Sequence, residues 1–173
     1  YITYQKYNAS NVTKSLDRLI DKTQQVRRDV ARHSKEIDYD WLKKYTDEQR
    51  LSGITLMSPS GDVVQEYKTV DIPDAEVRKE IKREVVLNTA QYELKNYAER
   101  IETEDGTLVD ISAVGRPDQK GVIVCYNATK AQYAKNYALS IQSLLEGYNM
   151  HTNGTIIITK GKKIIASDWK SVV

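Results

Sequence analysis

The residue types that most often catalyse reactions or bind metals are scarce in this sequence. The chain of 173 residues has one cysteine, Cys125, and two histidines, His33 and His151, which lie far apart. Neither a His-x-x-x-His nor a Cys-x-x-Cys spacing occurs, so no metal site is expected. Cys125 lies within the apolar run 122–126, where a small buried side chain is expected rather than a nucleophile. The sequence therefore predicts no catalytic residue, no metal and no cofactor.

Gly115 and Gly121 are spaced almost like the glycines of a phosphate-binding loop. Such a loop should lead into a helix whose free amides meet the phosphate. Here Pro117 removes one amide and an apolar run follows, so a hairpin turn is predicted instead. The 26 basic residues are balanced by 24 acidic ones, for a net charge of +2. Because this charge creates no strong positive field, no nucleic acid partner is expected.

Tyrosine is the predominant aromatic residue of the chain, with twelve tyrosines and no phenylalanine. Its ring adds apolar surface and its hydroxyl can form hydrogen bonds, so some tyrosines could line a polar pocket. Asp110 and Ser112 lie off the apolar face of the strand predicted at 107–114. The candidate ligand-binding residues are therefore Tyr126, Tyr92, Asp110 and Ser112.

One long helix is predicted near the N-terminus, because residues 15–45 contain neither glycine nor proline. Apolar residues recur in three- and four-residue steps, with Thr23 and His33 at the intervening positions; they are Leu16, Leu19, Val26, Val30 and Ile37. A helix of about 30 residues would be about 45 Å long, which exceeds the width of a domain of this size. We therefore expect it to project or to pair along its apolar seam, forming a homodimer through the N-terminal helix.

After Gly53 the pattern changes to short strands that alternate with turns and helices. The predicted elements are strands 54–57 and 63–67 around a turn at 58–62, a helix from 73 that reaches as far as 98, strands 107–114 and 122–126, a helix at 129–146, and a hairpin of 154–159 with 163–167. Every strand-to-strand connection is short, which favours an antiparallel sheet. The expected fold class is therefore α+β, with a long N-terminal helix followed by an antiparallel sheet flanked by helices.

Two turn motifs occur in order after the long helix. The first is 58–61, followed by Val63 and Val64, and the second is 117–121, followed by Val122 and Ile123. With this element order, the chain resembles the extracytoplasmic Cache (PDC, PAS-like) sensor domains of bacterial membrane receptors. The resemblance covers most of the chain and implies a PAS-like sheet.

The resemblance also implies an organisation and a function. Residues 1–50 would form a signalling helix and residues 51–173 a sensor module, whose part from about 150 would either complete this module or begin a second one. The domain would be non-catalytic, would bind a small molecule between the sheet and a helical segment, and would lie outside the cell. The parent protein would be anchored in the membrane and would most plausibly be a two-component sensor histidine kinase. The alternatives are a diguanylate cyclase, a chemoreceptor, or a cytosolic PAS-like dimerisation module.

Overall fold

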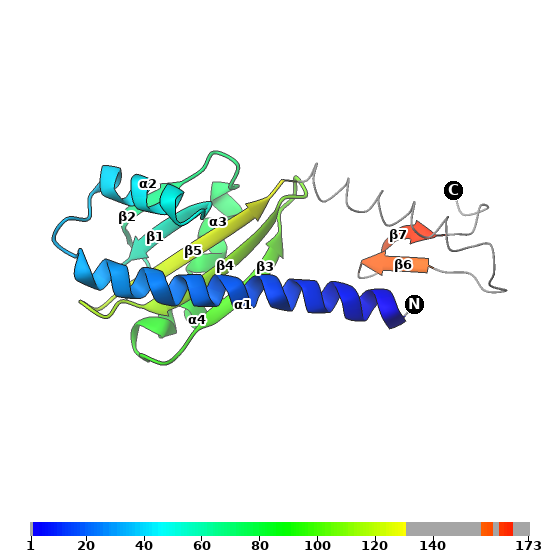
Figure 1. Cartoon of the computed structure of the whole chain (residues 1–173), viewed down its shortest axis with the longest axis horizontal. Coiled ribbons are helices and arrows are strands. Elements are labelled where there is room, and N and C mark those ends of the chain that lie inside the picture. Colours follow the sequence, from blue (N-terminus) through cyan, green and yellow to red (C-terminus); the bar gives the residue numbers. More distant parts are fainter. Residues whose placement is uncertain (1, 131–156, 161–162, 168–173) are drawn as a thin grey trace.

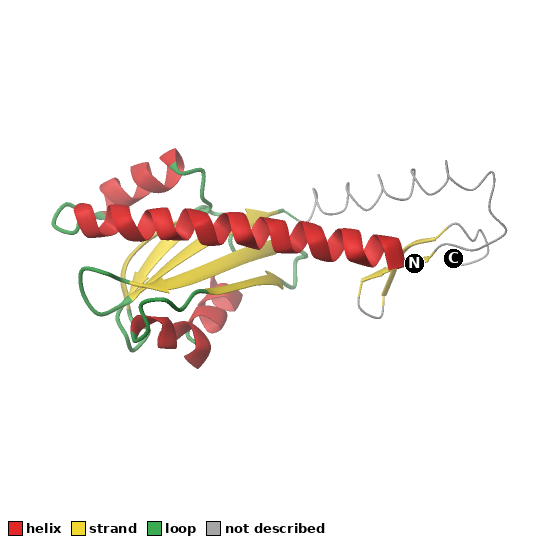
Figure 2. Cartoon of the chain, turned by 60° about the horizontal axis from the view of Figure 1, so that its bottom comes forward, coloured by secondary structure: helices red, strands yellow, loops and turns green. Residues whose placement is uncertain are grey.

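The fold is α+β, with helices on both sides of one antiparallel sheet (Figures 1 and 2). The computed structural model describes the backbone of residues 2–130, 157–160 and 163–167, and the side chains of residues 11–130. The helices are α1 (Ile2–Arg32), α2 (Tyr39–Glu48), α3 (Asp74–Ile81), α4 (Glu84–Leu87) and the 3₁₀ turn η1 (Asn88–Ala90). The strands of the main sheet are β1 (Gly53–Met57), β2 (Val63–Lys68), β3 (Tyr97–Glu102), β4 (Leu108–Gly115) and β5 (Val122–Thr129). The predicted fold class, a long N-terminal helix followed by a PAS-like antiparallel sheet, is confirmed.

The five-stranded sheet has the order β2-β1-β5-β4-β3, which places β5 at its centre. Side chains of β5 alternate between the two faces, so that Val124 and Tyr126 join one core and Ile123 and Cys125 join the other. This arrangement explains why 122–126 reads as a continuous apolar run, since both faces of the strand are covered. The predicted hairpin of β1 and β2 is also confirmed, with Gly61 at φ 91° in the turn between them.

Helices α1 and α2 cover one face of the sheet, which we call the α1 face. Val26 and Val30 of α1 are fully buried there, together with Leu42 of α2. The prediction of one helix through residue 45 is wrong, because the chain leaves the helix after Arg32 and begins a new one at Tyr39. Asp38 caps α2 by accepting a hydrogen bond from the Trp41 amide at 2.8 Å. The reversal brings α2 back against the sheet, which buries its apolar side.

The predicted seam of α1 packs on the sheet of its own chain. Leu19 and Val26 are at most 1% exposed, and Thr23 between them is buried with its hydroxyl bonded to the Leu19 carbonyl at 2.7 Å. His33 lies beyond the helix and contacts Glu36 at 3.0 Å. The expected pairing of this seam with a second copy is therefore wrong for residues 19–30. The exposed side of α1 is polar, with Lys14, Asp17, Arg18, Asp21, Gln25, Arg28 and Arg32, and no described helix is apolar and long enough to span a membrane.

The other face, which we call the α3 face, is covered by α3, α4 and η1. The helix predicted from 73 to as far as 98 is broken into these three short pieces, and its last part is the edge strand β3. Strand β3 pairs with β4 from Tyr97 opposite Ala113 to Glu102 opposite Leu108. Gly106, at φ 83°, lies in the turn that joins the two strands.

The C-terminal part contains the predicted closing hairpin. Strands β6 (Ile157–Lys160) and β7 (Lys163–Ser167) pair in antiparallel fashion as a separate two-stranded sheet. The helix predicted at 129–146 lies outside the described residues except at its first two positions, where Thr129 ends strand β5.

Candidate functional site

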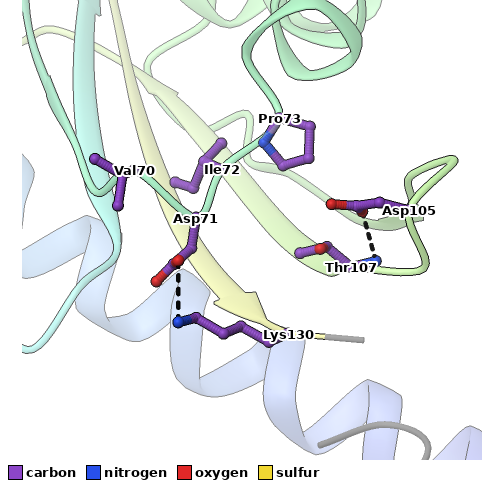
Figure 3. A pocket seen from close by; sticks show the side chains of 7 residues that line it. All are labelled: Val70, Asp71, Ile72, Pro73, Asp105, Thr107 and Lys130. Carbon is purple, nitrogen blue, oxygen red and sulfur yellow. Dashed lines mark hydrogen bonds and ion pairs between the residues drawn. The ribbon is translucent and has the colours of Figure 1, made fainter. Parts of the chain in front are cut away.

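A pocket of about 430 Å³ opens at the end of the sheet where β5 ends (Figure 3). Its walls come from residues 70–73, which belong to the connection between β2 and α3, from Asp105 and Thr107 in the β3–β4 turn, and from Lys130 just after β5. We call residues 69–73 the pocket loop. The volume lies within the range of roughly 300–1,000 Å³ that is usual for small-molecule sites.

An ion pair crosses one side of this pocket. The Lys130 ammonium lies 3.1 Å from Asp71 Oδ1, and both side chains are partly exposed. Such a pair contributes at most about 1 kcal/mol, because water screens it. A charged group of a ligand could therefore replace either partner at little cost. Figure 3 shows the pair reaching from the pocket loop to the end of β5.

Asp105 supplies a second carboxylate on the opposite wall. Its Oδ1 accepts hydrogen bonds from the Thr107 amide at 3.0 Å and from the Thr103 hydroxyl. The bond from Thr103, with that from the Thr107 backbone, lowers the pKa of Asp105. The pocket thus combines one ammonium with two carboxylates, one of which is held ionised by its own turn.

A second ion pair closes the base of the pocket loop. Lys68 precedes the loop and Asp74 follows it, and the Lys68 ammonium bonds to Asp74. This contact is the largest cause of a lowered pKa at Asp74. The Lys68 side chain is only 9% exposed, and its ammonium also lies 3.5 Å from Glu66 Oε1. The loop is consequently held at its base by Lys68 and Asp74 and at its tip by Asp71 and Lys130.

A chain of hydrogen bonds leads from the base of this loop to the centre of the sheet. Arg78 of α3 binds Glu66 of β2 through both of its terminal nitrogens, each at 2.9 Å. Thr55 of β1 donates to Glu66 at 2.6 Å, and the Tyr126 hydroxyl donates to Thr55 at 2.9 Å. Burial raises the pKa of Glu66, but the bonds from Arg78 and Thr55 outweigh it, so that the pKa is lowered overall. The network therefore ties α3 to three neighbouring strands.

Two of the sequence-predicted residues, Asp110 and Ser112, lie together on the α1 face. Asp110 accepts from Arg100 at 2.6 and 3.0 Å and from the Ser15 hydroxyl of α1 at 2.6 Å. Ser112 is fully buried, and its hydroxyl has no hydrogen-bond partner in the described part of the chain. Both side chains are thus covered by α1.

The other two predicted residues lie elsewhere. Tyr126 is fully buried on the α3 face, where burial raises its pKa far above the usual value. Tyr92 is 56% exposed in the loop before β3, with the Lys95 ammonium 5.3 Å from its ring centroid. None of the four predicted residues lines the 430 Å³ pocket, and their contact with a ligand stays a prediction.

The pocket residues escaped the sequence analysis because no short motif contains them. Asp71 and Lys130 are brought together by the fold from distant parts of the sequence. Glu66 and Lys68 alternate along β2 and so place two charges on the same face at the base of the pocket loop, but neither residue lines the pocket. Within residues 11–130, no group of three or more His, Cys, Asp or Glu side chains could hold a metal ion.

Comparison with known proteins gives one likeness among solved structures. No family model matches the chain, and no curated protein matches it. The chain is similar to the sensory domain of the Campylobacter jejuni chemoreceptor Tlp3 (CcmL), solved with isoleucine bound, at 13% sequence identity and a TM-score of 0.48. The alignment covers 94% of this chain and 66% of that one, so the chain spans just under two thirds of the neighbour's length.

Proposed function

We propose that this chain is a ligand-sensing domain of the Cache (PDC, PAS-like) type from a bacterial membrane receptor, and that it lies on the extracytoplasmic side. The observation that carries the proposal is the placement of a charged pocket at the edge of the α3 face, while a 31-residue helix lies along the opposite face. A ligand site on one face of a sheet and a stiff rod on the other are the parts that a sensor needs. The domain has no chemistry of its own in this proposal.

The proposed organisation follows the sequence analysis. Residues 1–50, which contain α1 and α2, form the signalling segment, and residues 51–173 form the sensor module, whose part from about 150 either completes this module or begins a second one. The parent is anchored in the membrane ahead of α1. A sensor histidine kinase and a chemoreceptor are both retained as the parent protein, with a diguanylate cyclase as a further alternative.

A ligand would act by exchanging contacts at the pocket loop. If its charged groups replace the bond between Asp71 and Lys130, the tip of the pocket loop takes a new position while Lys68 and Asp74 still hold its base. The movement reaches α3 through Asp74, and reaches β5 through Glu66 and Thr55. Because protein interiors are closely packed, a shift of β5 on the α3 face is also felt by α1 on the other face.

Homodimerisation through the N-terminal helix remains part of the proposal, but fewer residues of the helix are free to form the interface. The seam from Leu19 to Val30 is covered by the sheet, and Ser15 is bonded to Asp110. A dimer through α1 would therefore use residues ahead of Ser15. Tyr126, Tyr92, Asp110 and Ser112 stay proposed as ligand-binding residues. Of these, Tyr126 is connected to the base of the pocket loop by hydrogen bonds.

The test is a thermal-shift screen of the full chain with small organic acids, sugars and amines, followed by pocket variants. A compound at one hundred times its dissociation constant should raise the melting temperature by roughly 5–10 °C. For an acidic compound the response should be lost in Lys130→Gln, and for a basic compound it should be lost in Asp71→Asn. In both cases it should be kept in Lys43→Gln, an exposed lysine on α2. A screen without any stabilising compound, or one whose hit binds equally to all three variants, contradicts the proposal.

A further inference from the structure

A second pocket, of about 260 Å³, lies apart from the first and has a different chemistry. It is enclosed by Arg27 of α1, by residues 89–91 and Glu93 at the end of η1 and in the connection that follows it, and by residues 115–117 at the end of β4 and the start of the β4–β5 turn. Two of these walls approach so closely that only glycine fits at position 115, because a Cβ there would lie 2.5 Å from the Thr89 carbonyl oxygen. The pocket thus joins α1 to two connections of the sheet.

Two largely buried arginines line this pocket. The Arg27 side chain is 18% exposed and the Arg116 side chain 5% exposed. Arg27 donates from Nε to the Gly115 carbonyl at 3.2 Å and from Nη2 to Glu93 at 3.3 Å. Arg116 uses Nε and Nη2 to bind Asp118, at 3.1 and 2.8 Å. Among the described residues, the Nη1 group of each guanidinium therefore has no hydrogen-bond partner.

An N–H group of a guanidinium that has no protein partner can bind a further acceptor. Neither Nη1 atom is among the buried side-chain atoms that lack a partner in the described part of the chain, so water reaches both from the pocket and an acceptor can take its place. Glu93, the one carboxylate that lines the pocket, is 80% exposed, and its contact with Arg27 is long. Glu93 is thus a weak partner that can swing into solvent. An oxyanion suits the vacated position, since guanidinium groups match the geometry of carboxylates and phosphates.

We propose that the pocket between Arg27 and Arg116 binds a small oxyanion, a carboxylate or a phosphate group, which bridges α1 to the β4–β5 turn. The cavity equals several water volumes of about 30 Å³ each, which leaves room for one such anion and a few waters. The anion replaces Glu93 at Arg27 and fastens α1 to the sheet. This site is separate from the 430 Å³ pocket and does not depend on the proposed sensing function.

The experiment titrates the full chain with sodium phosphate and, separately, with sodium acetate, at constant ionic strength made up with sodium chloride. Thermal stability and calorimetric binding are measured for the wild type and three variants. Glu93→Gln should bind the anion roughly two- to fivefold more tightly, because a surface competitor is removed. Arg27→Gln should bind about tenfold more weakly or worse, because a charge-assisted hydrogen bond is lost.

Arg32→Gln is the matched control, since it removes the same charge from an exposed position on the same helix. It should bind like the wild type. Equal binding by Arg27→Gln and Arg32→Gln, weaker binding by Glu93→Gln, or no saturable effect of either anion beyond that of chloride would each overturn the proposal. Glu93 is an exposed position, so its variant gives an answer even if Arg27→Gln fails to fold. A variant that loses anion binding but keeps its response to a compound in the first pocket separates this proposal from the sensing one.

Discussion

Ser112 provides a sharp test of the packing on the α1 face. Its hydroxyl is a buried side-chain polar atom without a hydrogen-bond partner among the described residues. The residue opposite in the register is Cys125, a weak hydrogen-bonding group, and the nearby helix hydroxyl of Thr23 already donates to Leu19. We therefore expect Ser112→Ala to make the protein more stable.

The size of the effect follows from two opposing contributions. An unpaired buried polar group costs about 1–3 kcal/mol in the free energy of unfolding, which the alanine variant regains. The lost packing of one buried atom costs at most about 0.8 kcal/mol, the value for a buried methylene group. The net stabilisation should thus be about 1 kcal/mol, which corresponds to a rise of about 2–4 °C in melting temperature for a domain of this size.

Thr55→Val is the matched control, because it removes a buried hydroxyl that is paired on both sides. The loss leaves the Tyr126 hydroxyl without its acceptor and Glu66 without one donor. It should lower the free energy of unfolding by about 1–3 kcal/mol. Urea unfolding of both variants, followed by tryptophan fluorescence with unchanged m-values, measures the two effects. If Ser112→Ala were as destabilising as Thr55→Val, a partner of the Ser112 hydroxyl would have to exist and the reasoning would fail.

Two further predictions concern titratable groups. Glu66→Gln should lower the free energy of unfolding by about 1–3 kcal/mol near neutral pH, since it breaks the paired bond with Arg78. The pKa of Glu66 is lowered in the fold, so its contribution to stability is present above about pH 4.5 and is lost as the pH falls through the folded-state pKa. The difference in free energy of unfolding between wild type and Glu66→Gln should therefore shrink from neutral to acidic pH. A difference that does not change with pH argues against this role. Cys125 is buried and its pKa is raised to about 12, so a disulfide reagent should label it in urea but not in the native state; rapid native labelling would place the thiol at the surface.

The parts of the fold that the sequence predicts are those with strong local signals. The β1–β2 hairpin has a glycine-containing turn between two short strands, and Gly61 takes the positive φ that such a turn needs. Strand β5 is an unbroken apolar run because both of its faces are buried. In these segments the local preference and the final packing favour the same structure, so sequence alone suffices.

Segments shaped by distant contacts were missed. The break between α1 and α2 contains no glycine or proline, and the reversal is stabilised by the packing of Leu42 and by the bond from Tyr45 to Asp29 at 2.6 Å. Strand β3 lacks an apolar alternation, because Glu99 faces the same side as Tyr97 and accepts a hydrogen bond from its hydroxyl at 2.7 Å. A polar residue on the inner face conceals the period of two on which strand prediction depends.

The residues of the candidate site could be predicted only in part, for a similar reason. Asp110 and Ser112 were chosen because they lie off the apolar face of β4, and the sequence did not show which element covers that side. The sheet is covered on both faces, so this second side meets α1. The pocket itself lies where a connection, a turn and a strand end converge, and such a convergence has no signature in a single sequence.

Helix α1 is attached to the sheet by apolar packing along one part and by a hydrogen bond along another. This difference affects how a signal would pass from the sheet to the helix. From Leu19 to Val30 the buried positions are mostly apolar, and burial of such side chains is worth about 1.5–3 kcal/mol each. Nearer the N-terminus, a hydrogen bond from Ser15 attaches the helix to Asp110 of β4, and Asp110 also accepts from Arg100. A hydrogen bond contributes less than an apolar cluster and can be re-formed after a small shift. Among the described side chains of α1, we therefore expect the attachment at Ser15 to yield before the apolar attachment from Leu19 to Val30 if the sheet moves.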